Sequence, residues 1–340
     1  MTVSFIVVAY NAGSKLENLL SDLEEQNYNH NDIEIILVDS SSSDNTKDVM
    51  MKFKELNKSF SRVIVLDNPK KILPCGWNVA LAESTGDIIL RVDAHSSLPK
   101  DFISKNVKRI EMGEKIVGGH RISIIDEDNA WQKTLLTAEK SIFGSGIASY
   151  RRQEKEEYVS TLAHAAYSRE TFKKVGGYDE RLARTEDNEM HYRMKSAGYK
   201  FLLDPTIKSY HHARNSLSKM MRQKYLNGYW IGLTMGVSPK CFSIYHFVPL
   251  LFVLALILTT IGAVVISPIP LIILLAVYFT FNIINTIFST IKEKKHFSYL
   301  FLPMIFFLLH VSYGWGTLYG LIKLPFWIRN NRIFKYPIIK

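Results

Sequence analysis

Three long apolar runs in the C-terminal part of the chain limit the choice of fold more than any other feature. They cover residues 244–266, 269–289 and 298–322 and are almost free of charge. Each is long enough to cross the hydrocarbon core of a bilayer, which is about 30 Å thick and needs a helix of about 20 residues. Up to about Phe242 the sequence carries charges throughout. The 340 residues are therefore predicted to form one large soluble domain followed by a helical membrane region.

The flanks of these runs predict how the region crosses the membrane. Ser267-Pro268 leaves almost no loop between the first two runs, so they are expected to form a hairpin. The basic stretch 292–295 follows the second run, and positive charge marks the cytoplasmic side, which also places the soluble domain there. A simple third crossing would put the basic tail 323–340 outside. A break near Pro303 or around 314–316, making the third run re-entrant or interfacial, is the favoured alternative because it returns the tail to the cytoplasm.

The formal net charge of +10 raises the question of a nucleic-acid partner. The sequence has no zinc-finger spacing, no RNA-binding aromatic motif and no basic recognition helix, so a nucleic-acid partner is not expected. Lysine and arginine also favour contact with anionic phospholipid and with phosphorylated substrates. Membrane phospholipid is therefore the expected partner of the basic residues.

The cysteines and the N-terminus agree with a cytoplasmic soluble domain. Cys75 and Cys241 cannot make a disulfide framework and match no metal-binding spacing, which fits a reducing compartment. The first apolar run lacks a preceding basic region and breaks at Asn11-Ala12-Gly13. It is therefore expected to be a strand rather than a signal peptide.

Strand-like and helix-like stretches alternate along the first 92 residues. The expected strands cover 4–9, 33–38, 63–66 and 87–92, and the expected helices cover 14–26, the stretch up to about Leu56, and 77–82. This order predicts an α/β fold with a parallel sheet covered by helices on both faces.

Polar residues end each of these four strands. Ligands of such sheets bind at the carboxyl ends of the strands, where Asn11, Asp39, Asp67 and Asp93 fall. The first strand is followed by Tyr-Asn-Ala-Gly at 10–13 and not by a Gly-x-Gly-x-x-Gly turn, which argues against a dinucleotide-binding fold. A Walker loop is equally absent from the sequence. Any phosphates bound at this edge must therefore be held in another way.

The fourth strand offers a candidate phosphate-binding site, because it ends in Asp93-Ala94-His95. Side chains at i and i+2 of an extended chain point to the same face, so Asp93 and His95 can hold one divalent cation together, and the cation can hold a nucleotide diphosphate. Taken alone, an Asp and a His after a strand are more often ordinary turn residues. Their place beside three other polar strand ends favours the metal site.

The motifs together resemble the inverting nucleotide-sugar transferases of glycosyltransferase family two, which have the Rossmann-like GT-A fold with a mostly parallel sheet. The matching pieces occur in family order, namely 7–11, 38–46, 86–95, Gly-Gly-Tyr-Asp-Glu at 176–180 and Thr-Glu-Asp at 185–187. Within the family, Asp-Ala-His at 93–95 and Arg-Gln-Lys-Tyr at 222–225 resemble bacterial transferases of the succinoglycan-biosynthesis type.

The resemblance implies catalytic and acceptor-binding residues. Asp187 would be the general base that takes the proton from the acceptor hydroxyl, and Glu186 would orient it. The alternative is that both acids only stabilise the N-terminus of a helix expected over 188–198. The residues expected to bind the acceptor are Gly177, Tyr178, Asp179 and Trp230.

Donor-binding residues follow from the same resemblance. Asp39 would bind the uracil or its ribose, while a turn-capping role remains its alternative, as a turn role does for Asn11. The stretch 222–230 loosely resembles the Gln-x-x-Arg-Trp helix of processive relatives, but an interfacial helix on the membrane explains it equally well. The full set expected to bind the donor is Ala9, Tyr10, Asn11, Asp39, Asp67, Arg91, Asp93, Arg214, Arg222, Gln223 and Tyr225.

His95 departs from the family pattern, in which most members have a second carboxylate at this position. Imidazole suits Mn²⁺ better than Mg²⁺, so either the preference leans to manganese or His95 contacts phosphate through water while Asp93 binds the ion alone. His211 is a third candidate ligand, since some relatives use a late histidine, although one member of the pair His211-His212 is expected to be a surface residue. The expected cofactor is Mn²⁺ or Mg²⁺.

The complete expectation is a metal-dependent inverting hexosyltransferase of the bacterial cytoplasmic membrane. Its donor would be a nucleotide-diphosphate sugar, a UDP-sugar by resemblance, and its acceptor a lipid-linked saccharide of an exopolysaccharide, capsule or surface glycan. Alternatives are a polyprenyl-phosphate sugar synthase, a processive synthase, or a non-catalytic scaffold, and homo-oligomerisation stays open. The expected divisions are a transferase domain at 1–215, a connecting segment at 216–243, membrane helices at 244–322 and a basic tail at 323–340.

Overall fold

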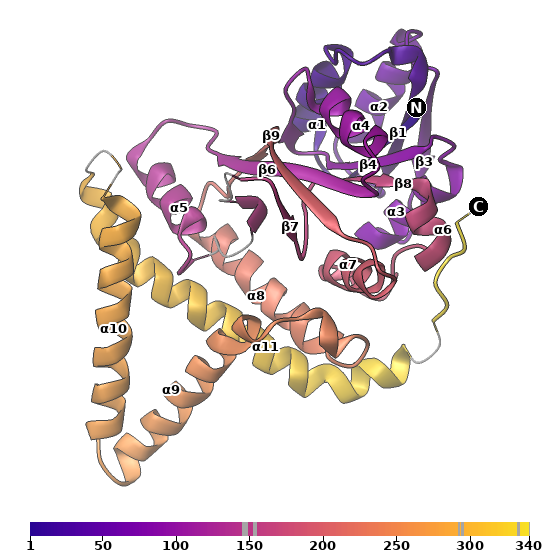
Figure 1. The fold of residues 1–340 in the computed structure, drawn as a ribbon. Helices are drawn as coiled ribbons and strands as arrows, with labels where there is room; N and C mark the ends of the chain where they lie inside the picture. The colour runs from indigo at the N-terminus through magenta and orange to yellow at the C-terminus, as the bar shows by residue number, and fades with distance from the viewer. Residues whose placement is uncertain (145–148, 152–154, 292, 294–295, 332–333, 340) are drawn as a thin grey trace. The chain divides into compact units, whose positions relative to one another are not determined.

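The computed structural model describes residues 1–144, 149–151, 155–291, 293, 296–331 and 334–339. These residues form two compact units, each assembled from separate stretches of the chain (Figure 1). The first unit draws on 1–122, 148–212 and 333–340, and the second on 123–147 and 213–332. The linear boundaries expected above stay a prediction. Lys292, Lys294 and Lys295, used above to orient the membrane region, lie outside the described residues, as do Arg332 and Lys340.

The parallel part of the sheet in the first unit confirms the predicted alternation of strands and helices. Its strands β1 (Val3–Ala9), β2 (Ile33–Asp39), β3 (Arg62–Asp67) and β4 (Ile88–Asp93) lie in the order β3-β2-β1-β4. Their pairings are parallel. The register sets Ala9 opposite Asp39 and Asp39 opposite Asp67, which aligns the strand ends. The connecting helices are α1 (Gly13–Glu24), α2 (Thr46–Leu56) and α3 (Leu73–Glu83).

Burial on both faces explains why these strands are continuous apolar runs. β1 and β2 are buried along their whole length. Alternate side chains of β1 enter two core clusters, since Phe5 belongs to the one that contains Leu19 and Met50, and Ile6 to the one that contains Trp77. The buried Trp77 alone would cost about 3–5 kcal/mol on truncation to alanine. Helices on both faces are what a parallel sheet requires.

The rest of the sheet is antiparallel and is not predicted by the sequence patterns. Its strands are β5 (Ser96–Ser97), β6 (Ile116–Ile124), β7 (Glu157–Val159), β8 (Ala166–Ser168) and β9 (Phe201–His212). β8 pairs with β4 and β6, and β9 pairs with β5 and β7. β5, β7 and β8 have two or three residues each, too few for an alternation to be recognised. The sheet of the first unit is therefore mixed, with a parallel and an antiparallel part.

β9 continues without interruption through Asp204-Pro205. The Asp204 carboxylate accepts hydrogen bonds from the Thr206 N–H at 2.8 Å and from Arg109 Nε at 2.6 Å. These bonds hold the chain extended past the proline. The extension carries the strand as far as His211 and His212, which matters for the site.

The first unit is completed by further helices and by the C-terminal end of the chain. The helices are α4 (Phe102–Glu111), α6 (Arg169–Val175) and α7 (Glu186–Ser196), with short 3₁₀ turns at His30–Asp32 and Ser149–Arg151. Residues 334–339 return to this unit, and their yellow trace passes α6 in Figure 1. Their contacts are described below.

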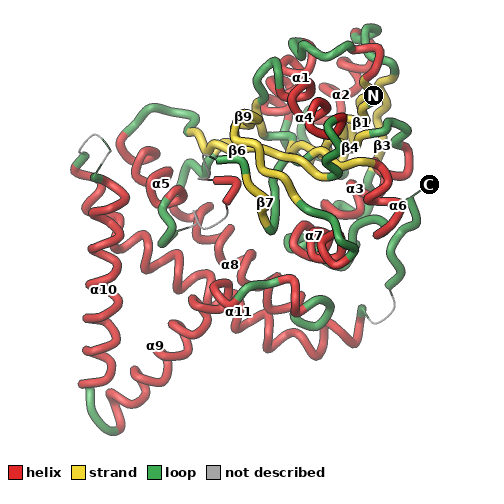
Figure 2. Tube along the Cα trace, viewed as in Figure 1, coloured by secondary structure: helices red, strands yellow, loops and turns green. Residues whose placement is uncertain are grey.

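The second unit consists mainly of helices joined by loops (Figure 2). It contains α5 (Ala130–Lys140), α8 (Leu217–Thr234), α9 (Val248–Val265), α10 (Ile269–Thr290) and α11 (Leu302–Asn330), with 3₁₀ turns at Pro239–Cys241, Ile244–Phe247 and Phe297–Phe301. Within the described residues, three segments are long and apolar enough to cross a membrane, namely Ile244–Val265, Ile269–Thr290 and Phe297–Asn330. The expected apolar runs are thus all helical.

The expected break in the third run is wrong, because α11 is continuous through 314–316. Pro303 lies in the first turn of the helix, where its missing N–H would have had no partner. Gly316 stays helical because it meets the backbone of α8: a Cβ built there would lie 2.1 Å from the Tyr225 carbonyl oxygen. Likewise a Cβ on Gly228 of α8 would lie 2.0 Å from the Tyr313 carbonyl oxygen. The glycines therefore allow close packing of α8 on α11.

Candidate functional site

A carboxylate and two imidazoles meet where β4 ends. One ligand atom each from Asp93, His95 and His211 can be chosen so that all lie within 4.8 Å of one another. The pairing of β5 with β9 produces this arrangement, since it sets Ser96 opposite His211 and so brings His211 beside His95. The two imidazole rings lie edge to face with their centroids 4.8 Å apart. The expected metal ligands are therefore together in the structure.

The cluster suits a divalent metal. His211 is buried, and its Nδ1 atom has no hydrogen-bond partner among the described residues. Burial, with the nearby Arg121, lowers the pKa of His211, so its ring is neutral at pH 7, the form that binds metals. A buried ring nitrogen without a partner is costly in a protein core, and a bound metal ion would satisfy it.

His164 is a member of this site that the sequence analysis missed. Its Nε2 lies 3.3 Å from Asp93 Oδ2 and 3.1 Å from Ser96 Oγ, and its Nδ1 lies 2.9 Å from Ser209 Oγ. Burial would raise the pKa of Asp93, but the His164 contact and further positive groups outweigh it and hold that pKa well below its usual range. His164 thus orients an ionised Asp93. Its isolated position in the run 162–167 gives no spacing from which this role could be predicted.

The expected general base is bound to a buried arginine. Both terminal nitrogens of Arg91 donate to the Asp187 carboxylate, one of them, Nη2, at 2.7 Å from Oδ2. The guanidinium lies 4.9 Å from the ring centroid of Trp77 and 5.5 Å from that of Tyr178. Burial would raise the pKa of Asp187, but the ion pair outweighs it and the net pKa is lowered. The Asp187 side chain is still 36% exposed, so an acceptor can reach it.

Glu186 has the opposite electrostatic character. It is buried, and its Oε2 atom has no hydrogen-bond partner in the described part of the chain. Burial and the charge of Asp187 raise the pKa of Glu186 to about 8. Glu186 therefore carries a proton at neutral pH while its neighbour is ionised. Glu186 is then able to donate a proton and Asp187 to accept one.

The ends of β1 to β3 carry five of the eleven residues expected to bind the donor, namely Ala9, Tyr10, Asn11, Asp39 and Asp67. Asp39 is buried, and both of its carboxylate oxygens lie 3.3 Å from the Ser42 backbone nitrogen, which donates to them. Asn11 has a φ of +48° and its Oδ1 accepts the Ser43 N–H at 2.8 Å, tying β1 to the turn after β2. Ala9 is buried, Tyr10 is 57% exposed, and Asp67 pairs with Lys47 at 2.7 Å.

The residues expected to bind the acceptor fall into two sets. Tyr178 and Asp179 are buried, the first beside Arg91 at 3.1 Å and the second in an ion pair with Arg181 at 2.7 Å. Gly177 lies in the same loop, whose backbone is held by Asn78 through bonds to both the N–H and the C=O of Tyr178. Trp230, the fourth residue expected to bind the acceptor, belongs to the second unit, as do four residues expected to bind the donor, namely Arg214, Arg222, Gln223 and Tyr225.

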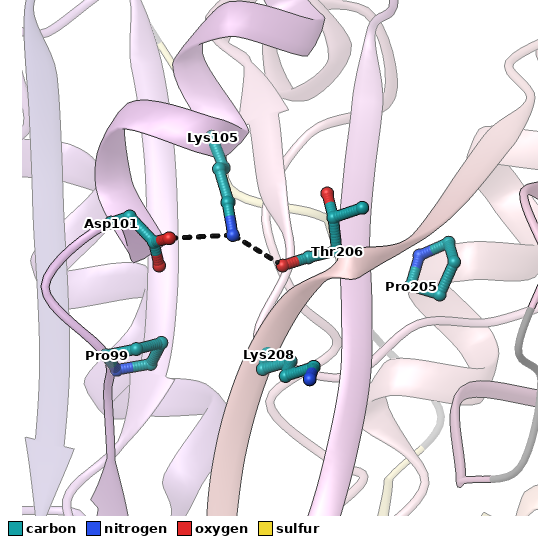
Figure 3. Close-up of a pocket in the computed structure, with 6 residues that line it drawn as sticks. All are labelled: Pro99, Asp101, Lys105, Pro205, Thr206 and Lys208. Atoms are coloured by element: carbon teal, nitrogen blue, oxygen red, sulfur yellow. Dashed lines mark hydrogen bonds and ion pairs between the residues drawn. The ribbon is translucent and has the colours of Figure 1, made fainter.

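A surface pocket of the first unit lies apart from this chemistry (Figure 3). It is lined by residues that follow β5 and by the middle of β9. In it, the Lys105 ammonium group donates to the Thr206 carbonyl at 2.9 Å and pairs with Asp101 at 2.7 Å. The pocket shares no residue with the Asp93, His95 and His211 cluster.

Known proteins resemble this chain in both sequence and fold. The succinoglycan biosynthesis protein ExoA of Rhizobium meliloti is 29% identical over 66% of this chain and 67% of its own length. A dolichyl N-acetyl-alpha-D-glucosaminyl phosphate 3-beta-D-2,3-diacetamido-2,3-dideoxy-beta-D-glucuronosyltransferase of Methanococcus voltae is 25% identical over 94% of this chain and 97% of its own length.

Among solved structures, a mannosyltransferase of Pyrobaculum calidifontis in complex with GDP-Man and Mn²⁺ matches with a TM-score of 0.62. It is 17% identical, and the match covers 95% of this chain and 86% of that one, so it confirms the GT-A fold. The protein-family model described as "Glycosyl transferase family 2" matches residues 4–176, which is half of the chain. The chain is therefore a glycosyltransferase and belongs to glycosyl transferase family 2.

Proposed function

We propose that this protein transfers a hexose, with inversion, from a nucleoside-diphosphate sugar to a lipid-linked saccharide, in a reaction that needs a divalent metal. The observation that carries the proposal is that one candidate metal ligand and the arginine that binds the candidate base lie on the same strand. Asp93, His95 and His211 are together at the end of β4, and Arg91, two residues before Asp93 on the same strand, binds the Asp187 carboxylate. A leaving-group site and a base therefore lie next to each other.

The metal would be held by Asp93 and by the imidazoles of His95 and His211, and when bound it would neutralise the diphosphate leaving group. Asp187 accepts the proton of the acceptor hydroxyl as the new oxygen–carbon bond forms and the bond from the anomeric carbon to the diphosphate oxygen breaks. Arg91 holds the Asp187 carboxylate in one orientation, and Glu186, protonated at neutral pH, adds no second negative charge. Attack opposite to the departing diphosphate gives inversion.

The donor and acceptor classes come from the strand ends and from the relatives. Asp39, buried at the end of β2, is assigned to the uracil or ribose of a UDP-sugar. The archaeal relative, which aligns with nearly the whole chain, is named for transfer to a dolichyl-phosphate-linked sugar, and this supports a lipid-linked acceptor. The name of the succinoglycan relative supports a place in exopolysaccharide synthesis.

We also assign the protein to the bacterial cytoplasmic membrane, with the first unit in the cytoplasm. The segment 213–332 leaves the first unit and returns to it, because residues 334–339 pack in that unit. An even number of membrane crossings follows from this return. α9 and α10 form the crossing hairpin, and α11 lies at the membrane surface, packed on α8, which carries Lys219, Arg222 and Lys224.

The test of the function is transfer of radiolabelled sugar from a series of nucleotide sugars to a lipid extract of the host, with the products separated by size. The expected result is label from one UDP-sugar in a lipid-linked product that is larger by one sugar. Long products would indicate a processive synthase, and a single-sugar lipid would indicate polyprenyl phosphate as the acceptor. Absence of transfer from every donor, UDP-sugars included, would refute the proposal.

A further inference from the structure

We propose that the C-terminal segment 334–339 is a positioning element of the active site, which fixes the loop 176–179 and helix α7 in the geometry needed for transfer. The inference rests on the proposed function, because it concerns the acceptor side of that reaction. The segment follows the membrane-associated helices in the chain and yet packs in the catalytic unit.

One side chain anchors the segment in the core. Ile339 is 4% exposed and belongs to the same core cluster as Trp77 and Tyr178, the two rings that flank Arg91. Its neighbour Ile338 is 89% exposed. Two adjacent isoleucines therefore differ almost completely in burial, which is what a docked strand-like segment produces.

The backbone of the segment closes on the glycine pair of the loop. The Gly177 N–H donates to the Pro337 carbonyl at 2.8 Å. Gly176 has a φ of +80°, and a Cβ built there would lie 3.1 Å from Tyr336 Cβ. A Cβ on Gly177 would lie 3.3 Å from Pro337 Cβ and 2.5 Å from Asn78 Oδ1. Glycine is needed at both positions because the segment and Asn78 occupy the space.

Tyr336 connects the segment to α7 through Arg193. The Tyr336 hydroxyl donates to Glu189 Oε1 at 2.9 Å, and the Arg193 guanidinium lies 3.9 Å from the centre of the Tyr336 ring. Arg193 in turn pairs with Glu189 at 2.7 Å and donates to the carbonyls of Val175 and Gly177 at 2.6 and 2.8 Å. One guanidinium thus joins the C-terminal segment, the loop and the helix.

These contacts connect the C-terminal segment to Arg91 and Asp187 through a few neighbouring residues. Gly177 precedes Tyr178, whose hydroxyl oxygen lies 3.1 Å from an Arg91 nitrogen, and Arg91 holds Asp187. α7 carries Asp187 in its first turn and Glu189 and Arg193 farther along. Release of the segment would therefore free the loop and the helix that orient the base. Tyr336 and Ile339 are positioning residues, since neither touches the reacting atoms.

The adjacent isoleucines provide a matched test in the full-length protein. Ile339→Ala is expected to lower kcat by about tenfold, with the KM for the donor changed less than about twofold, because misplacement of reacting groups acts on turnover. Ile338→Ala removes the same atoms from an exposed side chain and is expected to leave both constants unchanged. Equal kinetics for the two variants, expressed per folded protein, would overturn the proposal.

Tyr336 separates positioning from simple loss of stability. Tyr336→Phe keeps the ring against Arg193 and removes only the bond to Glu189, so it is expected to retain more activity than Tyr336→Ala. Melting temperatures are measured on the same samples. A fall in melting temperature in Tyr336→Ala without a fall in kcat per folded protein would assign the segment a structural role only.

Hydrogen exchange at the Gly177 amide tests the docking without any turnover. The amide is expected to be protected in the wild type and in Ile338→Ala, and to exchange at least about tenfold faster in Ile339→Ala, since its acceptor, the Pro337 carbonyl, is displaced. Unchanged protection in Ile339→Ala would refute the docking itself. Failure of the wild type to transfer sugar from any donor would instead refute the proposed function, and this measurement distinguishes the two failures.

Discussion

The parallel and antiparallel parts of the sheet build their shares of the site in different ways. In the parallel part, Asn11 and Asp39 are held by the turns that follow their own strands or the next one, through Ser42 and Ser43. The stretches that follow β6 supply the other groups: His164, just before β8, reaches Asp93 of β4 across 71 positions, and Asp187 of α7 reaches Arg91 of β4 across 96. The proposed nucleotide side of the site is thus built locally, and the proposed reacting side is assembled from distant stretches.

This difference indicates where the site is most easily disturbed. A local turn needs only residues close to it in the chain. A long-range contact forms only when the whole antiparallel part is folded. We therefore expect substitutions on the reacting side to have larger effects on turnover than equivalent substitutions on the parallel side.

The first comparison uses two aspartates that each lie in the first turn of a helix, Asp187 in α7 and Asp48 in α2. Asp187→Asn is expected to lower kcat by about 10²–10⁴-fold while donor binding is preserved, because a general base contributes that much. Asp48→Asn should leave turnover nearly unchanged. Transfer assays and equilibrium binding of the donor measure both. Near-normal turnover of Asp187→Asn would show that the acid only stabilises the helix terminus.

The second comparison uses the adjacent histidines at the end of β9. His211→Gln is expected to weaken Mn²⁺ binding by more than the 10–100-fold that an outer-shell partner contributes, and His212→Gln to have little effect. Mn²⁺ titration followed by electron paramagnetic resonance measures the affinity directly. EDTA should stop turnover of the wild type and Mn²⁺ should restore it. Full activity in chelator would contradict a metal at this cluster.

The third substitution tests the support behind the metal site. His164 has a φ of +49°, a conformation that asparagine tolerates well, so His164→Asn keeps the backbone while shortening the side chain. Loss of the contact to Asp93 is expected to lower Mn²⁺ affinity by about 10–100-fold. The same titration reports this change. Wild-type affinity would mean that Asp93 is oriented by other groups.

The sequence predicts the parallel part well for a physical reason. β1, β2 and β4 are buried along nearly their whole length and β3 is half-buried, and the four strands alternate with helices. Each element therefore has its own signal, and the polar strand ends follow from the alternation. Asp93 and His95 do lie together, but the extended geometry expected for them is wrong, because β4 ends at Asp93 and residues 94–95 form a turn before β5. Asp187 and Glu186 come from the resemblance to the family, and their roles stay predictions.

The remainder of the site depends on contacts that have no local signature. His164 and the docked segment 334–339 act through partners more than 70 positions away, and β5, which aligns His211 with His95, has only two residues. Arg91 was expected at the donor, but its pairing with Asp187 follows from the placement of α7 against β4, which spacing does not specify. Tertiary packing decides these positions, and periodicity does not report it.

Acid should loosen the antiparallel part before the parallel part. His191 of α7 lies 2.8 Å from both Thr161 Oγ1 and Tyr167 OH, and burial lowers its pKa to about 4 from 6.5. Below pH 6.5 the His191 ring binds a proton in the unfolded chain but not in the folded protein. The free energy of unfolding therefore falls between pH 6.5 and about 4, by an amount of order 1–3 kcal/mol. His191→Gln removes this titration and is expected to flatten the loss of stability in that range.

Glu34 of β2 gives the parallel counterpart. Burial would raise its pKa, but hydrogen bonds from Ser4, Thr85 and Arg62 outweigh it and the net pKa lies below 4.5. Its stabilising contribution is therefore complete above pH 4.5 and is lost only as the pH falls further. Hydrogen exchange at pH 5 should thus show weakened protection in α7 and β8 while β1 and β2 stay protected. Simultaneous loss in both parts would mean that the sheet unfolds as one cooperative unit in acid.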